Sequence, residues 1–447
     1  MAARRAAAWL IVASFVFAPA AAAGMAHENG SSAVVVNSGD SAAAQPADQA
    51  ARLILSRCGG NRPRYDCVSA AVLELVDRSG PAYAMAVLEE LTARQPTLRP
   101  DAHGLAHAIG IRAYQSRATL SEVFATCPAT HLSGCYHGVM QAYFLELRES
   151  RTPVTSSLLD SLCEDHRSAG GGLYFQCVHG VGHGLMALHG NDLPGSLRSC
   201  DLLAARSNVE NCHAGAFMEN VIVATHPHHS ALAHAADVRR DDHAGHGAAG
   251  GEHGHGEADG DHDHGDHDSP DGGGGWVPLS RHDHQYPCSV LDPLYQAGCY
   301  NMQSSAMLFL NSGDAAKTAA DCERAPADFV VACLRSLGRD VFALSGGDYA
   351  RGALNCRALG PARELHCITG FAHTVMNIRG MGEDGLQFCE NVAGAQQRGV
   401  CYSAVGEMLF ALGAPPARRA ELCALAAAEH RGECAAGAGV PAGESPR

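Results

Sequence analysis

The residues of this 447-residue chain that are best suited to chemistry are histidines at helical spacing. His103 and His107 are four residues apart, and so are His179 and His183, with His137 between the two pairs. Residues at i and i+4 lie on one face of a helix, with their Cβ atoms roughly 5–6 Å apart. Two imidazoles at that distance can bind one metal ion, and an all-imidazole ligand set suits zinc, copper or iron. The pattern predicts one ordered site with three to five of these histidines as ligands, or two linked sites.

The same histidines have two other interpretations. Glycine directly follows His103, His137 and His179, at Gly104, Gly138 and Gly180, and glycine allows close helix contact. The histidines can therefore be hydrogen-bonded packing residues that were multiplied with a repeat. They can also have a catalytic role in proton transfer. A metal-dependent enzyme is a further alternative function, in which the histidines bind the ion, leave one coordination position open and have Glu146 or Glu219 as a nearby general base. The sequence contains no nucleophile elbow and no phosphate loop, so it specifies neither a reaction nor a catalytic residue.

A second group of histidines lies in one long segment of low complexity. Thirteen of the chain's twenty-six histidines lie between 226 and 284, where they alternate with Asp and Gly. The segment has too few apolar residues to offset the entropy lost on ordering, so residues 224–285 are predicted to be a disordered insert. Imidazoles and carboxylates together would capture Zn(II), Ni(II) or Cu(II) with low specificity. A solvated spacer between two sub-arrays is the other interpretation. The predicted capture residues are His253, His255, His262, His264 and His267.

Cysteines mark the elements that must position the ordered histidines. The eighteen cysteines form nine close couples: Cys58 with Cys67, Cys127 with Cys135, Cys163 with Cys177, Cys200 with Cys212, Cys288 with Cys299, Cys322 with Cys333, Cys356 with Cys367, Cys389 with Cys401, and Cys423 with Cys434. The second members of the last five couples follow one another at steps of 34, 34, 34 and 33 residues, and Cys67 and Cys135 are 68 apart. Halfway between those two, both cysteines of the expected couple are absent together, and Asp101 stands at the position of the second one. A couple that is lost as a unit indicates one disulfide within each repeat, and hence an oxidising compartment.

Each repeat is predicted to be a helical hairpin. An Ala-rich stretch that ends at Cys322 is followed by apolar residues at helical spacing from Phe329 to Val341, and Ser345 to Asp348 then interrupts the pattern. The disulfide would join a cysteine near the end of the first helix to one early in the second helix and contribute about 2–3 kcal/mol. One hairpin cannot bury its apolar face alone, but stacked hairpins bury a continuous core. The predicted fold is therefore an all-α solenoid of about ten hairpins with a period of about 34 residues and a disulfide in nine of them.

The period, the hairpin form and the paired cysteines resemble those of secreted, cysteine-rich Sel1-like and tetratricopeptide-type repeat proteins. The resemblance covers most of the mature chain and implies a curved array of hairpins with a concave face. Because such faces often bind a peptide or a protein, a metal-independent interaction scaffold is an alternative function.

The N-terminal sequence predicts export. Arg4 and Arg5, an apolar stretch from Ala6 to Phe17 and the small residues Ala20 to Ala23 have the layout of a secretory signal peptide. The predicted organisation is a signal peptide at 1–23, a flexible leader at 24–50, helical repeats at 51–223 and 286–436 on either side of the insert, and a disordered tail at 437–447.

The net charge and the hydropathy pattern exclude some partners. The formal net charge is −15 with histidine neutral, which argues against a nucleic-acid partner. No stretch after the signal peptide has the roughly 18 apolar residues that a membrane span needs. The predicted function is a periplasmic or secreted protein that binds transition-metal ions.

Overall fold

The computed structural model describes residues 45–99, 101–115, 119–169, 171–226, 276–379 and 383–440. All regular elements within these ranges are helices, and these ranges contain no strand. The described residues belong to one compact unit.

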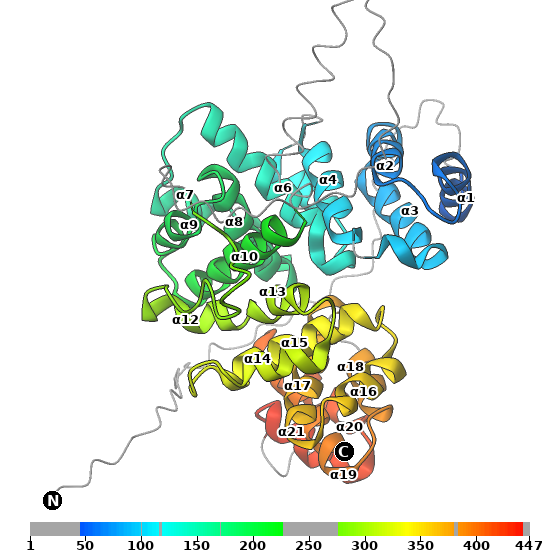
Figure 1. Cartoon of the computed structure of the whole chain (residues 1–447), viewed down its shortest axis with the longest axis vertical. Coiled ribbons are helices and arrows are strands. Elements are labelled where there is room, and N and C mark those ends of the chain that lie inside the picture. Colours follow the sequence, from blue (N-terminus) through cyan, green and yellow to red (C-terminus); the bar gives the residue numbers. More distant parts are fainter. Residues whose placement is uncertain are drawn as a thin grey trace, which may run out of the picture. The chain divides into compact units, whose positions relative to one another are not determined.

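Except in the sixth repeat, where the described residues contain no first helix, the helices alternate along the chain between the first and the second member of a hairpin (Figure 1). The first members are α1 (Ala47–Cys58), α3 (Pro81–Arg94), α5 (Leu120–Thr126), α7 (Ser156–Ser161), α9 (Leu193–Cys200), α14 (Ala315–Cys322), α16 (Tyr349–Ala358), α18 (Asp384–Glu390) and α20 (Pro416–Ala424). The second members are α2 (Tyr65–Ser79), α4 (Ala102–Gln115), α6 (Thr130–Glu149), α8 (Gly171–Leu188), α10 (Arg206–Thr225), α12 (Pro293–Tyr300) with α13 (Gln303–Leu310), α15 (Val330–Leu344), α17 (Pro361–Arg379), α19 (Ala395–Ala411) and α21 (Arg431–Gly437). The all-α hairpin array predicted from the sequence is confirmed.

All nine predicted disulfides are present. Eight close a helical hairpin, whereas in the sixth repeat Cys288 lies in a turn that no helix precedes within residues 276–292. Their Cα–Cα distances are 5.4–5.7 Å and their sequence separations are 8–14 residues. In the seventh hairpin, for example, Cys322 ends α14 and Cys333 lies in the first turn of α15. The described residues contain no unpaired cysteine.

The disulfide between Cys200 and Cys212 illustrates this geometry. Its Cα–Cα distance is 5.7 Å, Cys200 ends α9, and Cys212 lies in the second turn of α10, early in the second helix as predicted. Cys212 is fully buried, so the bond lies inside the array and not at its surface.

Glycine and aspartate separate one hairpin from the next. Gly313, with φ +83°, turns the chain after α13 in a conformation that other residues rarely adopt. Asp314 then caps α14, because its carboxylate accepts from the backbone N–H groups of Ala316 and Lys317. Asp348 caps α16 in the same way by accepting from the N–H of Arg351.

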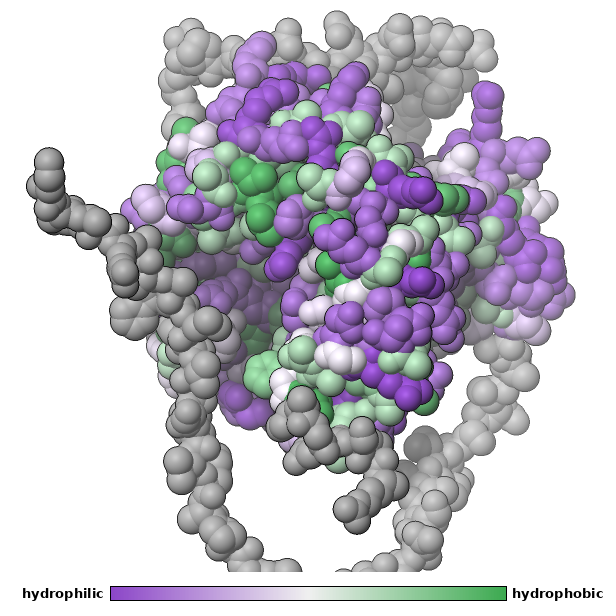
Figure 2. Space-filling view, turned by 90° about the horizontal axis from the view of Figure 1, so that it is seen from below, coloured by the Kyte–Doolittle hydropathy of each residue, from purple (hydrophilic) through white to green (hydrophobic). Residues whose placement is uncertain are grey.

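Stacking of the hairpins buries apolar side chains along the array. Phe371 of α17 and Phe388 of α18 are both fully buried, and their rings stack with centroids 4.1 Å apart. The large apolar side chains that stay exposed, such as Leu294 and Leu354, are scattered. The face seen in Figure 2 accordingly mixes hydrophilic and hydrophobic groups. No helix among the described residues combines the length and the apolar character that crossing a bilayer requires.

Pairs of glycines bring the backbones of successive second helices into direct contact. A Cβ atom on Gly138 of α6 would lie 2.0 Å from the carbonyl oxygen of His107 in α4, and one on Gly110 of α4 would lie 2.1 Å from that of Cys135. Only glycine fits such an approach. The same reciprocal contact joins α8 to α10, α15 to α17, and α19 to α21, through Gly182 and Gly215, Gly338 and Gly370, and Gly406 and Gly437. Side chains beside these contacts can therefore meet across helices that touch backbone to backbone.

These contacts correct the repeat register of the second hairpin. In three helix pairs, the first glycine lies five residues after the cysteine of its own helix. It also faces the backbone carbonyl of the cysteine in the next second helix. These sets are Cys177, Gly182 and Cys212; Cys333, Gly338 and Cys367; and Cys401, Gly406 and Cys434. Gly110, which faces Cys135, lies five residues after Leu105. Leu105 therefore holds the position of the missing cysteine, and the placement of Asp101 there was wrong by one helical turn. The prediction assumed that the repeats have equal lengths. The step from Cys67 to Leu105 is in fact longer than the step from Leu105 to Cys135.

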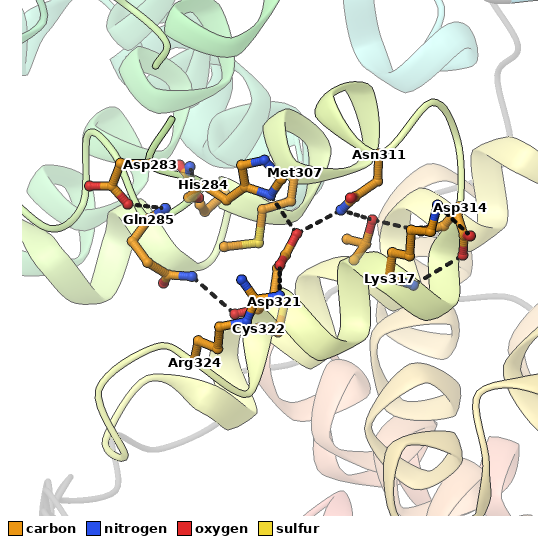
Figure 3. A network of polar contacts seen from close by, with 12 residues as sticks. Asp283, His284, Gln285, Met307, Asn311, Asp314, Lys317, Asp321, Cys322 and Arg324 are labelled. Atoms are coloured by element: carbon orange, nitrogen blue, oxygen red, sulfur yellow. Dashed lines mark hydrogen bonds and ion pairs between the residues drawn. The ribbon is translucent and has the colours of Figure 1, made fainter. Parts of the chain in front are cut away.

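A polar network around Asp321 holds the chain where it rejoins the array after the histidine-rich segment (Figure 3). The buried Asp321 carboxylate accepts from His284 Nδ1 at 2.6 Å and from Asn311 Nδ2 at 2.7 Å, while Gln285 Nε2 donates to the Asp321 carbonyl at 3.0 Å. Residues 276–285, which the sequence assigned to the insert, thus include groups that contact the repeats. His253, His255, His262, His264 and His267 lie outside the described residues, as do the signal peptide at 1–23 and most of the leader.

Candidate metal centre

The structure brings the five helically spaced histidines together on three neighbouring second helices. His103 and His107 lie on α4, His137 lies on α6, and His179 and His183 lie on α8. Neighbouring rings within the cluster have centroids 4.1–5.5 Å apart, both within and between helices. The glycine contact between α4 and α6 allows this approach, because Gly138 directly follows His137 and packs on the backbone of His107.

Ligand atoms of these residues form three overlapping groups that could hold a metal ion. The groups are His103/His107/His137, His137/His179/His183 and His107/His183/Glu219, and the ligand atoms of each group lie within 4.8 Å of one another. His107, His137 and His183 each belong to two groups. The overlap fits either of the arrangements expected from the sequence, a single site or two linked sites.

Three of the histidines use Nδ1 to bind a neighbouring oxygen. His103 Nδ1 donates to the carbonyl of His131 at 2.8 Å, and His107 Nδ1 donates to Gln141 Oε1 at 3.1 Å. His183 Nδ1 donates to Glu219 Oε2 at 2.8 Å. A proton on Nδ1 leaves Nε2 with a lone pair, and metal-binding histidines are commonly oriented by such a second hydrogen bond.

The Nε2 atoms of His103 and His107 face each other. They are 3.0 Å apart. The separation equals that of an N–H···N hydrogen bond, which would need the proton of one ring on Nε2 instead of Nδ1. Two nitrogens bound to one ion at about 2.0–2.1 Å each are about 3 Å apart, so the observed distance suits a shared metal.

The interior of the cluster contains ring nitrogens without protein partners. Neither nitrogen of His137 has a hydrogen bond, and the same holds for His183 Nε2 and His179 Nδ1. Each of these side chains is buried, and an unsatisfied buried polar atom costs about 1–3 kcal/mol. Such atoms gathered at one point fit a site that is completed by a ligand.

Burial keeps these imidazoles neutral. It lowers the pKa of His179 to about 4 and holds the pKa values of His137 and His183 well below 6.5, with the neighbouring histidines adding to the effect on His137 and His183. Neutral imidazole is the form that binds metal ions. Burial also raises the pKa of Glu219 to about 8, and a cation beside this carboxyl group would favour its ionised form.

Sequence reasoning found the histidines but did not find the groups that orient them. In the sequence, Gln141 is marked only as a polar residue in α6 at the repeat position that His183 occupies in α8. Glu219 was one of two candidate bases, and the structure places it inside the cluster on α10. The other, Glu146, lies away from it and accepts from the Tyr114 hydroxyl at 2.5 Å. The His131 carbonyl carries no signal in the sequence, because its role depends on a local backbone conformation.

Comparison with known proteins adds no relative. No family model, no curated protein and no solved structure matches this chain. The site must therefore be interpreted from its own geometry.

Proposed function

We propose that this protein binds a transition-metal ion, zinc, copper or iron, at the cluster of His103, His107, His137, His179 and His183, with Glu219 as a ligand or as an orienting carboxylate. The observation that carries the proposal is the 3.0 Å separation of the His103 and His107 Nε2 atoms while both Nδ1 atoms are bonded to oxygens. The same two histidines belong to groups whose ligand atoms lie within 4.8 Å of one another, together with His137, His183 and Glu219.

The compartment and the insert complete the proposal. Nine disulfides fit an extracellular or periplasmic protein, and the layout of residues 1–23 supports export through a cleaved signal peptide. The histidine-rich segment would then capture metal ions weakly near the ordered site. Kinship with secreted Sel1-like repeat proteins is part of this proposal and rests on period, hairpin form and paired cysteines.

A competition titration against a chromophoric chelator tests the ordered site. In the full mature chain, His103→Ala combined with His107→Ala should lower the affinity for the most tightly held ion while leaving all disulfides oxidised. The matched control removes two histidines outside the cluster, His189→Ala with His366→Ala, and should leave that affinity unchanged. Equal affinities in the two double variants would rule out a metal site at this cluster.

A further inference from the structure

A pocket of about 380 Å³ opens at one edge of the metal centre. One side of its wall comes from α3 and the first turns of α4 and α6, and the other comes from α15, the loop that follows it and α17. Its volume lies within the range of about 300–1,000 Å³ that is usual for small-molecule sites. The pocket therefore has room for a small organic ligand.

His103 connects the pocket to the metal centre. It lines the pocket and is only partly buried, whereas the other four histidines of the cluster are at most 7% exposed. A molecule in the pocket would thus meet the cluster at His103. A metal ion bound between His103 and His107 would be the one nearest to it.

The wall of the pocket offers polar groups that suit an anion. Thr130 Oγ1 and His131 Nε2 are buried there without a hydrogen-bond partner. The guanidinium of Arg99 also lines the pocket, with Nε donating to the Thr92 carbonyl at 3.4 Å. Glu89 lines the rim but its side chain is exposed to solvent, where its charge is screened. Guanidinium groups bind carboxylates strongly because their N–H groups match both oxygens.

The rest of the wall is apolar. Leu132, Phe342 and Ile378 line it together with the small residue Ala343. A ligand that fits must therefore combine an apolar body with one anionic group.

Backbone strain is concentrated where the pocket meets the metal centre. His131, Leu132 and Ser133 have φ values of +50°, +55° and +64°, a left-handed conformation that costs other residues than glycine about 1–2 kcal/mol each. This segment aims the His131 carbonyl at His103 and places Thr130, His131 and Leu132 in the pocket wall. Such strain occurs mainly at functional sites, where it fixes a geometry that an unstrained chain would lose.

We propose that this pocket binds a small organic carboxylate, with the anionic group at Arg99, Thr130 and His131 and the apolar body against Leu132, Phe342 and Ile378. The claim that the ligand lies beside a metal ion rests on the proposed function, whereas the binding itself does not. A metal ion at His103 and His107 would then be accessible to an exogenous ligand, while an ion held by His137, His179 and His183 would not.

Benzoate is a suitable probe because it joins one carboxylate to one apolar ring. Its proton NMR lines would be recorded with the full mature protein in metal-free form, with one equivalent of Zn(II), and with one equivalent of Co(II). We expect benzoate to bind, and the paramagnetic Co(II) form to broaden its lines far more than the Zn(II) form. Arg99→Met should weaken benzoate binding at least tenfold, and Ala343→Trp should fill the pocket and abolish it. The matched controls Arg94→Met and Leu344→Trp lie outside the pocket wall and should leave binding unchanged.

The outcomes separate the pocket from the metal centre. Absence of benzoate binding, or binding that neither Arg99→Met nor Ala343→Trp alters, would overturn the pocket proposal even if Co(II) is held tightly. Binding that is lost in the pocket variants but is broadened equally by Co(II) and Zn(II) would overturn the claim that the ligand lies beside the metal. Failure to retain Co(II), with benzoate binding intact, would contradict the proposed metal centre and leave the pocket standing.

Discussion

The early and the late repeats use the same backbone packing for different polar groups. In α6 and α8 the histidines beside these glycines have buried ring nitrogens without a protein partner, as at His137 and His183. In α15 the equivalent region carries Arg339, whose guanidinium donates to Asp340 at 3.0 Å and to Ser305 at 2.7 Å. Arg339 thus has its charge paired within the protein, while the early repeats bury ring nitrogens that have no protein partner, as at His137. The comparison indicates that the same hairpin packing supports either kind of polar group, and that the side chains on these helices decide whether the array holds a ligand.

The largest expected effect comes from His137, one of the three histidines that belong to two ligand groups. We expect His137→Ala to lower the affinity for the tightest metal ion by more than about 100-fold, because it removes a direct ligand. Thr369→Ala changes the corresponding position in α17, two residues after Cys367, and should have no effect. Competition with a chelator of known affinity measures both variants. An equal metal affinity of the two variants would contradict the claim that the early repeats bind metal and the late repeats do not.

A smaller effect is expected from the carboxylate that orients His183. We expect Glu219→Gln to weaken metal binding about 10- to 100-fold, as is usual when a partner of a metal-binding histidine is changed. Glu407 of α19 also lies near a histidine, with Oε2 3.4 Å from His373 Nε2, and Glu407→Gln serves as the control. Isothermal titration with Zn(II) distinguishes the two. A loss of affinity in Glu407→Gln as large as that in Glu219→Gln would contradict the assignment.

The glycine contacts allow packing and metal binding to be separated. Gly138→Ala and Gly370→Ala should each destabilise the fold by about 1–3 kcal/mol, because the added methyl group would meet a backbone carbonyl at 2.0 Å or less. Only Gly138→Ala should also lower metal affinity, since only its helix pair carries the histidines. Urea unfolding and a metal titration on both variants test this. A metal site that is unchanged in Gly138→Ala would show that close helix contact does not position the imidazoles.

The smallest expected effect concerns the metal-free protein and pH. His179 has a pKa of about 4 instead of 6.5, so the unfolded state takes up this proton first and the folded state loses stability as pH falls from 6.5 toward 4. Glu219 has a pKa of about 8 instead of 4.5, so the unfolded carboxyl ionises first and the folded state loses stability as pH rises from 4.5 toward 8. Between pH 6.5 and 8 the ionisation of Glu219 has the larger effect on the free energy of unfolding. This free energy is expected to fall by at most about 1.4 kcal/mol per pH unit. Urea unfolding should show this slope in the metal-free wild type and in Glu407→Gln but not in Glu219→Gln, and its persistence in Glu219→Gln would assign it to another group.

Much of the fold followed from the sequence because cysteines recur with the repeat. The couples from Cys299 to Cys434 fix both the period and the place of each turn, so the hairpins and disulfides could be predicted. The register around Leu105 could not, because the hairpin without cysteines has no marker and its length differs from the average. The histidines could be named because i, i+4 spacing survives in any helix. The meeting of these histidines in one cluster depends on how closely α4, α6 and α8 approach one another. Gln141, Glu219 and the His131 carbonyl orient the imidazoles through three-dimensional contacts that sequence spacing does not encode.

The most direct test of the central claim is elemental analysis of the mature protein with residues 227–275 deleted, purified without chelators or added histidines. This deletion removes the capture histidines but keeps Trp276, which donates to Asn220 Oδ1 at 2.8 Å, and the network around Asp321. The account predicts that about one or two equivalents of a transition metal survive dialysis, and that His137→Ala in the same background retains none. A metal-free protein with its helices and nine disulfides intact would contradict the account and make the histidine cluster a packing feature.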